Sequence, residues 1–423
     1  MAQVPCAGTA RLNSRAVRDH NLALVLHALE RHHGGSRSLV CGATGLTPGA
    51  VTLLVNELMD AGFLVTGDTM EAEGGRRKKQ LSFSDDSYPV AVIELVPGRV
   101  RLVCEAFGGA RLVDETYERD FRGADAGDFA AFAAELICGL ARRLEAEGRL
   151  PLQAVGVITS APVRSNRSEV LANLDFGWEM MDFGALITRE LEERGVSVPV
   201  VLLKDADCAA WAEVRHMEDE GEQMPAGTLF ISSNDGIGGS FILGDRIYNG
   251  PLGTGMTIGH IQLNPEGELC CCGKRGCLTT YAGADALLEA SGLGPYARAH
   301  GRDAAVCELR RRWQAGEEPA HGAVERAIRY VRVAIEIALT LLVADCVIVG
   351  GYLATCIDEI LAVENGFSSL GVEGVTAFRP AALGPDAAVL GGLMRMRGAL
   401  IDHAAELMRG EPLDAATLLQ DTL

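Results

Sequence analysis

The chain has 423 residues, 48% of them hydrophobic and 22% charged, which is the composition of a soluble globular protein with two or three domains. Its formal net charge of −19 argues against a general polyanion binder. The first residues lack a basic run followed by an apolar core, and the most apolar run, from Ala334 to Gly351, is interrupted by Glu336 and Asp345. We therefore expect a cytoplasmic protein without a secretory signal or a membrane span.

The N-terminal fifth differs from the rest in charge. Residues 1–83 carry nine Lys and Arg against seven Asp and Glu, whereas the remainder carries 29 against 50. Only this first part has a balance that favours contact with nucleic acid, because the acidic remainder repels phosphates except at local patches.

The same part predicts three helices followed by a strand, a basic tip and a second strand. Gly45 makes a tight turn before a helix that Thr47 caps and Pro48 begins. "FLVTG" reads as a strand, and "EGGRRKKQLSF" as a basic tip that leads into another strand. This order is typical of a winged helix-turn-helix that binds double-stranded DNA. The alternative is a small three-helix bundle with a solvated basic loop.

The predicted DNA contacts lie on the recognition helix, just before it and at the wing. The helix offers small or neutral groups that read base edges, so the wing must supply much of the attraction to phosphate. An arginine at such a tip commonly enters a narrow minor groove. The candidate residues are Arg37, Thr47, Thr52, Asn56, Arg76, Arg77 and Lys78.

From Tyr88 onward, strands and helices alternate. "YPVAVIELVPGRVRLVCEAFGGARLV" predicts three strands joined by turns, and "VPVVLLKDADCAAWAEVRH" predicts a buried strand that runs into a helix. The pattern indicates an α/β fold whose central sheets are covered by helices.

The stretch "HIQLNPEGELCCCGKRGC" gathers soft metal ligands. Twelve cysteines in an intracellular chain favour a metal site with scattered core thiols over disulfides. One imidazole and three thiolates suit a tetrahedral structural Zn²⁺ site with no open position for water, and we treat Cys271 as a spare thiol. The predicted ligands are His260, Cys270, Cys272 and Cys277. The alternatives are a redox cluster and a metal-free cysteine-rich loop.

Several motifs together resemble the ROK family (repressor, open reading frame, kinase). They are "GGRRKKQLSF", "GVITSAPV", "ANLDFGW", "LLKDADCAAWAE", "NDGIGGSFILGDRIYNG", "IGH" and "CCCGKRGCLTTYAG". The resemblance implies a two-lobed, actin-like sugar-kinase fold, a homodimer or homotetramer, and the same four zinc ligands. It divides the chain into a winged helix-turn-helix domain at residues 1–84, a ROK domain at 88–400 with a zinc knuckle at 260–277, and a C-terminal helix or tail at 401–423.

Kinases of this family need a glycine-rich first loop led by an aspartate, which brings backbone amides to phosphate and a carboxylate to magnesium. In this chain the loop reads "VIELVPGRV". Glu94 stands in place of the aspartate, and Leu95 and Val96 replace glycines. We therefore expect that the protein is not an enzyme.

The sugar pocket that the resemblance implies is altered. Asp205 resembles the general base of the family, but its neighbour is Lys204 where the family has asparagine. Thr257 and Thr279 replace two carboxylates, and the remaining ligand candidates are Asn173, Lys204, Asp205 and His260. Such a pocket binds a neutral sugar weakly, binds a sugar phosphate or sugar acid with Lys204 as counter-charge, or binds nothing because Lys204 pairs with Asp205 or Asp207.

Two functions remain open at this stage. The first is a DNA-binding regulator of carbohydrate-related genes, with or without a sugar-like effector. The second is an ATP-dependent sugar kinase with an accessory N-terminal domain. The altered phosphate loop and the winged helix favour the regulator.

Overall fold

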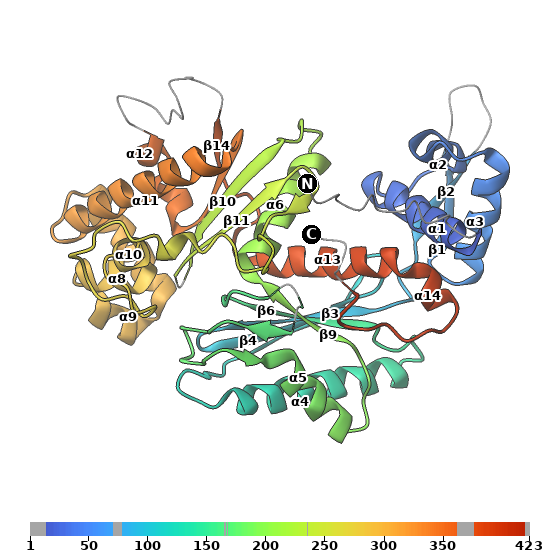
Figure 1. Cartoon of the computed structure of the whole chain (residues 1–423), viewed down its shortest axis with the longest axis horizontal. Coiled ribbons are helices and arrows are strands. Elements are labelled where there is room, and N and C mark those ends of the chain that lie inside the picture. The colour runs from blue at the N-terminus through green and yellow to red at the C-terminus, as the bar shows by residue number, and fades with distance from the viewer. Residues whose placement is uncertain are drawn as a thin grey trace, which may run out of the picture.

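The computed structural model describes residues 14–70, 78–164, 166, 168–234, 236–361 and 376–418. A small helical module lies beside two α/β lobes, and helix α13 (Ala387–Asp402) runs from between the lobes toward the module (Figure 1). Each lobe is built around a five-stranded sheet. The predicted α/β class, with an N-terminal module and a two-lobed body, is confirmed.

The N-terminal module contains three helices and a two-stranded antiparallel sheet. Its elements are α1 (Ser14–Arg31), α2 (Arg37–Thr44), α3 (Pro48–Asp60), β1 (Leu64–Met70) and β2 (Lys78–Phe83). The side chain of Ser36 caps α2, and that of Thr47 caps α3 by accepting a backbone N–H. Gly45, at a φ of 71°, turns the chain between the two helices, which meet at 117°. This angle lies within the range of about 90–120° found in helix-turn-helix motifs.

The first lobe has a mixed sheet with the strand order β5-β4-β3-β6-β9. Its elements are β3 (Val90–Val96), β4 (Arg99–Glu105), β5 (Arg111–Tyr117), α4 (Ala126–Ala146), β6 (Ala154–Thr159), the short β7 (Glu169–Val170) and β8 (Met181–Asp182), α5 (Phe183–Glu193) and β9 (Val200–Lys204). Strand residues alternate between two cores, because successive side chains of a strand point to opposite faces. Ile93 packs with α4 and α5, whereas Val92 packs on the face covered by α13.

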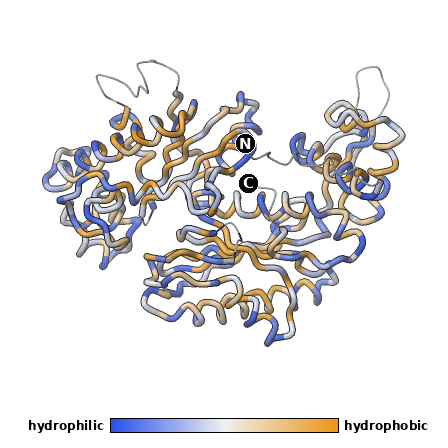
Figure 2. Tube along the Cα trace, viewed as in Figure 1, coloured by the Kyte–Doolittle hydropathy of each residue, from blue (hydrophilic) through white to orange (hydrophobic). Residues whose placement is uncertain are grey.

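The second lobe has the strand order β12-β11-β10-β13-β14. Its elements are α6 (Asp205–Asp219), β10 (Gly227–Ser233), β11 (Ile237–Leu243), β12 (Arg246–Ile247), η1 (Ile258–His260), α7 (Thr279–Ala282), α8 (Ala284–Ala290), α9 (Gly294–His300), α10 (Arg302–Gln314), α11 (Ala320–Leu342), β13 (Cys346–Gly351), η2 (Tyr352–Cys356), α12 (Ile357–Leu361), β14 (Ala377–Pro380) and η3 (Gly384–Asp386). Ile231 packs on the side of α11 and Phe230 on the side of α6. Apolar residues accordingly follow the strands of both lobes (Figure 2).

The module is joined to the body without a flexible connection. Six residues separate β2 from β3, and Ser84, Ser87 and Tyr88 among them are buried. The ring of Tyr88 stacks on Phe63 of the module with centroids 3.9 Å apart, and its hydroxyl donates to the Ala61 carbonyl at 2.8 Å. One hydrophobic cluster continues from the module into β3, β6 and α13.

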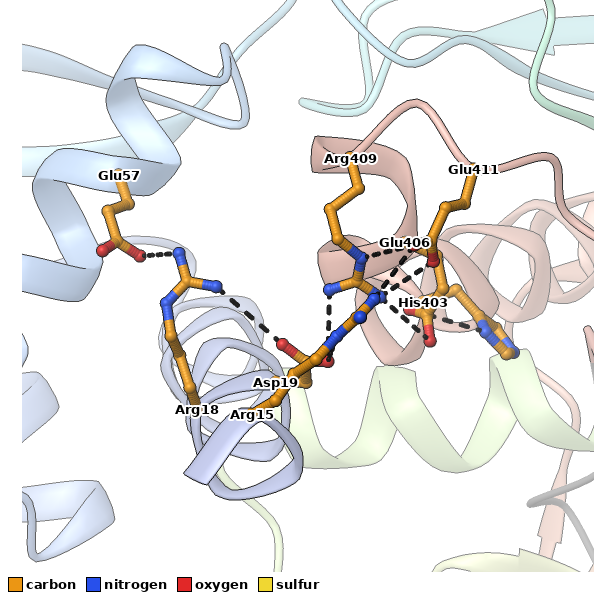
Figure 3. A network of polar contacts seen from close by, with 8 residues as sticks. All are labelled: Arg15, Arg18, Asp19, Glu57, His403, Glu406, Arg409 and Glu411. Atoms are coloured by element: carbon orange, nitrogen blue, oxygen red, sulfur yellow. Dashed lines mark hydrogen bonds and ion pairs between the residues drawn. The ribbon is translucent and has the colours of Figure 1, made fainter. Parts of the chain in front are cut away.

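Ion pairs add to this contact along α1. Arg409, which follows α14 (Ala404–Met408), lies 3.1 Å from Asp19, and Arg15 lies 3.0 Å from Glu411 (Figure 3). Most of these side chains are partly exposed, so each pair contributes little to stability by itself. Their effect is to fix which face of α1 meets the C-terminal segment.

His27 of α1 contacts Asp402 at the end of α13. Its Nε2 lies 2.7 Å from Asp402 and its Nδ1 lies 3.4 Å from Glu30. Burial lowers the pKa of His27, but hydrogen bonds to the two carboxylates outweigh burial and raise the pKa to about 9. The protonated ring therefore bridges α1 and α13 at neutral pH.

We expect this bridge to stabilise the protein below the unfolded-state pKa of about 6.5 and to be lost as the pH rises through 9. The difference in melting temperature between the native protein and His27→Gln should be largest near pH 6 and disappear above about pH 9. His300→Gln, on an exposed part of the second lobe, is the control. A difference that grows with pH would contradict the assignment.

Among the described helices, none by itself is long and apolar enough to cross a membrane. The bent pair of α2 and α3 reaches that length and composition only when both helices are counted together.

Candidate metal centre and ligand cleft

The four predicted metal ligands lie together in the second lobe. One ligand atom from each of His260, Cys270, Cys272 and Cys277 lies within 4.8 Å of all the others. The Cys270 Sγ is 3.5 Å from the His260 Nδ1, and the Cys272 Sγ is 3.6 Å from the Cys277 Sγ. A tetrahedral zinc ion with Zn–S of about 2.3 Å and Zn–N of about 2.0–2.1 Å would separate its ligands by roughly 3.5–3.8 Å. The side chains therefore fit a tetrahedral metal ion.

The loop that carries these residues is shaped by its glycines. Gly273 and Gly276 have φ values of 85° and 63°, which only glycine adopts readily, and a β-carbon at Gly276 would collide with the backbone of Asn264. The turn brings Cys277, which is fully buried, back toward Cys270. Cys271 is exposed and lies outside the four-residue group, as its treatment as a spare thiol predicts.

His260 lies near Asp175, whose charge also acts on Asp205, so the cluster and Asp205 face one region, which we call the cleft and define by Asn173, Asp205 and His260. Its Nδ1 faces Cys270, which leaves Nε2 as the nitrogen available to a ligand. Burial lowers the pKa of His260, and nearby Lys274 lowers it further. A neutral imidazole is the form that binds a metal ion.

Asp205 and Lys204 lie where β9 passes into α6. The Asp205 Oδ1 accepts the Ala206 amide at 2.6 Å. Burial raises the pKa of Asp205 to about 6, although the Ala206 amide and Lys204 oppose the rise. The group keeps a pKa suited to proton exchange near neutral pH.

Lys204 is 4% exposed, and its ammonium group forms hydrogen bonds with the protein's own backbone. Its Nζ donates to the carbonyls of Gly239 at 2.7 Å and Gly255 at 3.2 Å, and lies 3.5 Å from Asp207. Two of the three donors of the lysine are thus used in hydrogen bonds, and the Asp207 carboxylate balances its charge as an ion pair. The geometry therefore supports the alternative in which Lys204 pairs with Asp207. It argues against Lys204 as the counter-charge of a bound anion.

Asn173 is positioned by the strand next to β9. Its Nδ2 donates at 2.9 Å to Thr159, the last residue of β6, and Thr159 is the register partner of Lys204. The carboxyl ends of two parallel strands thus bring Asn173 and Asp205 to one edge of the sheet, the usual place of ligand sites in α/β folds. The Oδ1 of Asn173 is buried and has no hydrogen-bond partner among the described residues.

Two further side chains of the cleft were not predicted. Asp175 accepts a hydrogen bond from Ser160 at 2.5 Å, and its charge acts on both Asp205 and His260. Its position two residues after Asn173 in "ANLDFGW" was the only signal in the sequence.

The first phosphate loop is replaced by a tight turn. Val96 pairs with Arg99, so that Pro97 and Gly98 alone connect β3 to β4. Gly98 has a φ of 81°, which together with the preceding proline is typical of a type II turn. Pro97 has no N–H group, so the loop lacks a backbone donor at the point where phosphate would be bound.

Glu94, which stands in place of the magnesium-binding aspartate of the kinases, is paired with an arginine. It is 6% exposed and lies 3.3 Å from the Arg99 guanidinium. Burial raises the pKa of Glu94, and Arg99 opposes the rise. Next to it, Arg101 forms ion pairs with Asp114 of the same sheet and with Asp386, which precedes α13. The carboxylates near the turn are thus paired with arginines of β4.

The exposed face of α3 carries the predicted base-reading residues. Thr47, Thr52 and Asn56 are exposed, and Leu53 beside them is 62% exposed. Arg37 is half-buried and donates to the Asn56 Oδ1 at 2.9 Å, so it supports Asn56 and leaves the amide NH₂ of Asn56 to face outward. Arg76, Arg77 and the side chain of Lys78 lie outside the described residues.

The two five-stranded sheets and the His–Cys₃ cluster are those of a sugar-kinase-like protein that carries an additional N-terminal module. The chain belongs to the ROK family, whose model matches residues 135–398.

Similar proteins include kinases and regulators. A glucokinase from Streptomyces coelicolor is 33% identical over 136 residues, which are 32% of this chain and 40% of that protein, so the match spans two fifths of its length. A putative xylose repressor from a Caldicellulosiruptor species is 24% identical over 287 residues, covering 66% of this chain and 67% of the repressor. The crystal structure of a ROK family transcriptional regulator, a homologue of the E. coli MLC protein, aligns with a TM-score of 0.72 and 20% identity, covering 93% of this chain and 98% of that chain. This last match shows the fold.

Proposed function

We propose that the protein is a DNA-binding transcriptional regulator of carbohydrate-related genes and not a sugar kinase. The observation that carries the proposal is the Pro97–Gly98 turn, which removes the phosphate loop and leaves Glu94 paired with Arg99. The helix-turn-helix geometry of α2 and α3 supports it, as does the likeness to a regulator along 93% of the chain. In this proposal residues 1–84 bind the operator, residues 88–400 form the sensor body, and residues 401–423 attach the module to it.

We infer that the metal ion is Zn²⁺ in a structural role. Three thiolates and one imidazole use all four positions of a tetrahedral ion, so no position remains for a catalytic water. The ion would hold the ring of His260 through Nδ1 and thereby orient Nε2 toward the cleft.

For the cleft we propose a neutral sugar ligand, bound by Asn173, Asp205 and His260. Lys204 does not take part in binding, because its ammonium group donates to the carbonyls of Gly239 and Gly255. Asn173 keeps an unsatisfied Oδ1 that can accept a hydroxyl proton. With two carboxylates replaced by Thr257 and Thr279, we expect weaker binding than in a kinase pocket.

The module is proposed to respond to this cleft through α6 and α13. α6 begins at Asp205, and a β-carbon at Gly391 of α13 would collide with the backbone of Cys208 in α6, so the two helices are in direct contact. α13 then ends at Asp402 beside His27 of the module. In a homodimer or homotetramer, a change at the cleft would alter the distance between two modules bound to an operator with two half-sites.

A coupled assay with ATP, Mg²⁺ and common hexoses, glucose included, tests the exclusion of kinase activity. We expect phosphorylation no faster than the blank, because Pro97 offers no backbone donor and the carboxylate of Glu94 is paired with Arg99. Turnover above the blank that is abolished in Asp205→Asn would reverse the proposal.

Selection of bound fragments from random duplex DNA, followed by gel-shift titration at fixed salt, tests operator binding.

A further inference from the structure

A cavity lies between the N-terminal module and the body. Its volume is about 1080 Å³, and its walls come from α1, the end of β2, α6, the β11–β12 turn and α13. None of the cleft residues Asn173, Asp205 and His260 lines it. A volume of this order is typical of sites for small molecules.

The carboxylates that line the cavity are already paired. Each has a partner within the described chain, either a cation, an imidazole or a backbone amide. The pairs are Glu30 and Asp402 with His27, Asp219 with His33, Glu218 with Arg215, Asp245 with Arg246, and Asp85 with the amide of Ala110. The acidic groups of the wall are therefore balanced by internal contacts.

Arginine donors remain after this pairing. Arg395 is 4% exposed, and its charge acts on Asp207 and Cys208 of α6. No nitrogen or oxygen acceptor of the described residues takes a hydrogen bond from its two terminal nitrogens. Arg397, which is half-buried, also lies on α13 and lines the cavity. Its Nε has no hydrogen-bond partner within the described part of the chain. Arg31 is exposed at the end of α1 and also lines the cavity. Buried guanidinium donors without hydrogen-bond acceptors are costly, and an anion in the cavity would supply acceptors.

We propose that this cavity binds the phosphate group of a small phosphorylated metabolite. A guanidinium matches two phosphate oxygens at once, and arginines of both α1 and α13 line the cavity. Trp211, which carries Arg215 over its ring at 4.3 Å, forms an apolar wall for the organic part of the ligand. The anion site therefore lies at the junction of module and body and not at Lys204.

Calorimetry of the full-length protein at low ionic strength tests this site. The probes are inorganic phosphate, glycerol 3-phosphate and glucose 6-phosphate, with glucose as the neutral control. We expect the phosphate probes to bind, and Arg31→Gln and Arg397→Gln each to weaken binding roughly 10-fold through the loss of a charge-assisted hydrogen bond. Arg329→Gln, an exposed arginine of α11 outside the cavity, should leave the affinity unchanged.

Arg31 is exposed, so its replacement tests the site without disturbing the core. Equal affinity for inorganic phosphate and the two esters would identify phosphate itself as the ligand, and tighter binding of an ester would identify a phosphorylated metabolite. No binding of any phosphate probe at millimolar concentration would overturn the proposal. So would an affinity unchanged in both arginine variants but lost in Asp205→Asn, because the anion would then lie in the cleft. No DNA is present, so the result stands independently of whether the protein is a regulator.

Discussion

Cys277→Ser is expected to prevent binding of the proposed zinc ion and to destabilise the second lobe. Cys277 is fully buried, and the adjacent Leu278 lies in the core of that lobe, so the metal loop anchors α7. We expect a loss of at least about 5 kcal/mol, a fraction of the roughly 10–16 kcal/mol that structural zinc contributes to small domains near neutral pH. Elemental analysis and the melting temperature measure the two effects.

Cys271→Ser is the matched control, because the neighbouring thiol is exposed and outside the ligand group. It should retain one zinc ion per chain and an unchanged melting temperature. Native protein that contains no zinc, or a Cys277→Ser variant as stable as the native chain, would show that the loop folds without metal.

Arg76→Ala combined with Arg77→Ala is expected to weaken operator binding on the order of 100-fold at moderate salt, because two cations leave the wing. These two residues lie outside the described part of the chain, so the prediction rests on the basic tip between β1 and β2. The slope of log affinity against log salt should also fall by about 2.

The matched control removes two exposed arginines of α11, Arg326 and Arg329, and should leave both the affinity and the salt slope unchanged. Circular dichroism should show that both double variants remain folded. An unchanged slope in the wing variant would mean that the tip does not touch the DNA backbone, even if affinity fell for another reason.

Local signals in the sequence predicted those parts of the fold that depend on neighbouring residues. The cap at Thr47 and the glycine turn at Gly45 predicted the helix-turn-helix order, because capping and left-handed turns are decided within a few residues. The spacing of Cys270, Cys272 and Cys277 predicted the metal cluster for the same reason.

Contacts between distant segments were not predictable in this way. Lys204 was weighed as the counter-charge of a ligand, but the carbonyls that hold it come from residues 35 and 51 positions later. Arg37 stays a predicted DNA contact, and its hydrogen bond to Asn56 on the next helix had no signal in the sequence. The pairing of Arg101 with Asp386 spans 285 positions. Such contacts depend on how the helices and sheets pack, which hydrophobic periodicity does not specify.

The short connection between β2 and β3 limits how the protein can search DNA. Ser84, Ser87 and Tyr88 are buried, and Tyr88 stacks on Phe63. The N-terminal module therefore cannot move away from the body on a flexible linker to reach a second half-site. In an oligomer, the distance between two N-terminal modules would be fixed by the bodies to which they are attached. Operators lengthened or shortened by half a helical turn should therefore lose bivalent binding altogether, whereas a regulator with a loose linker would tolerate them.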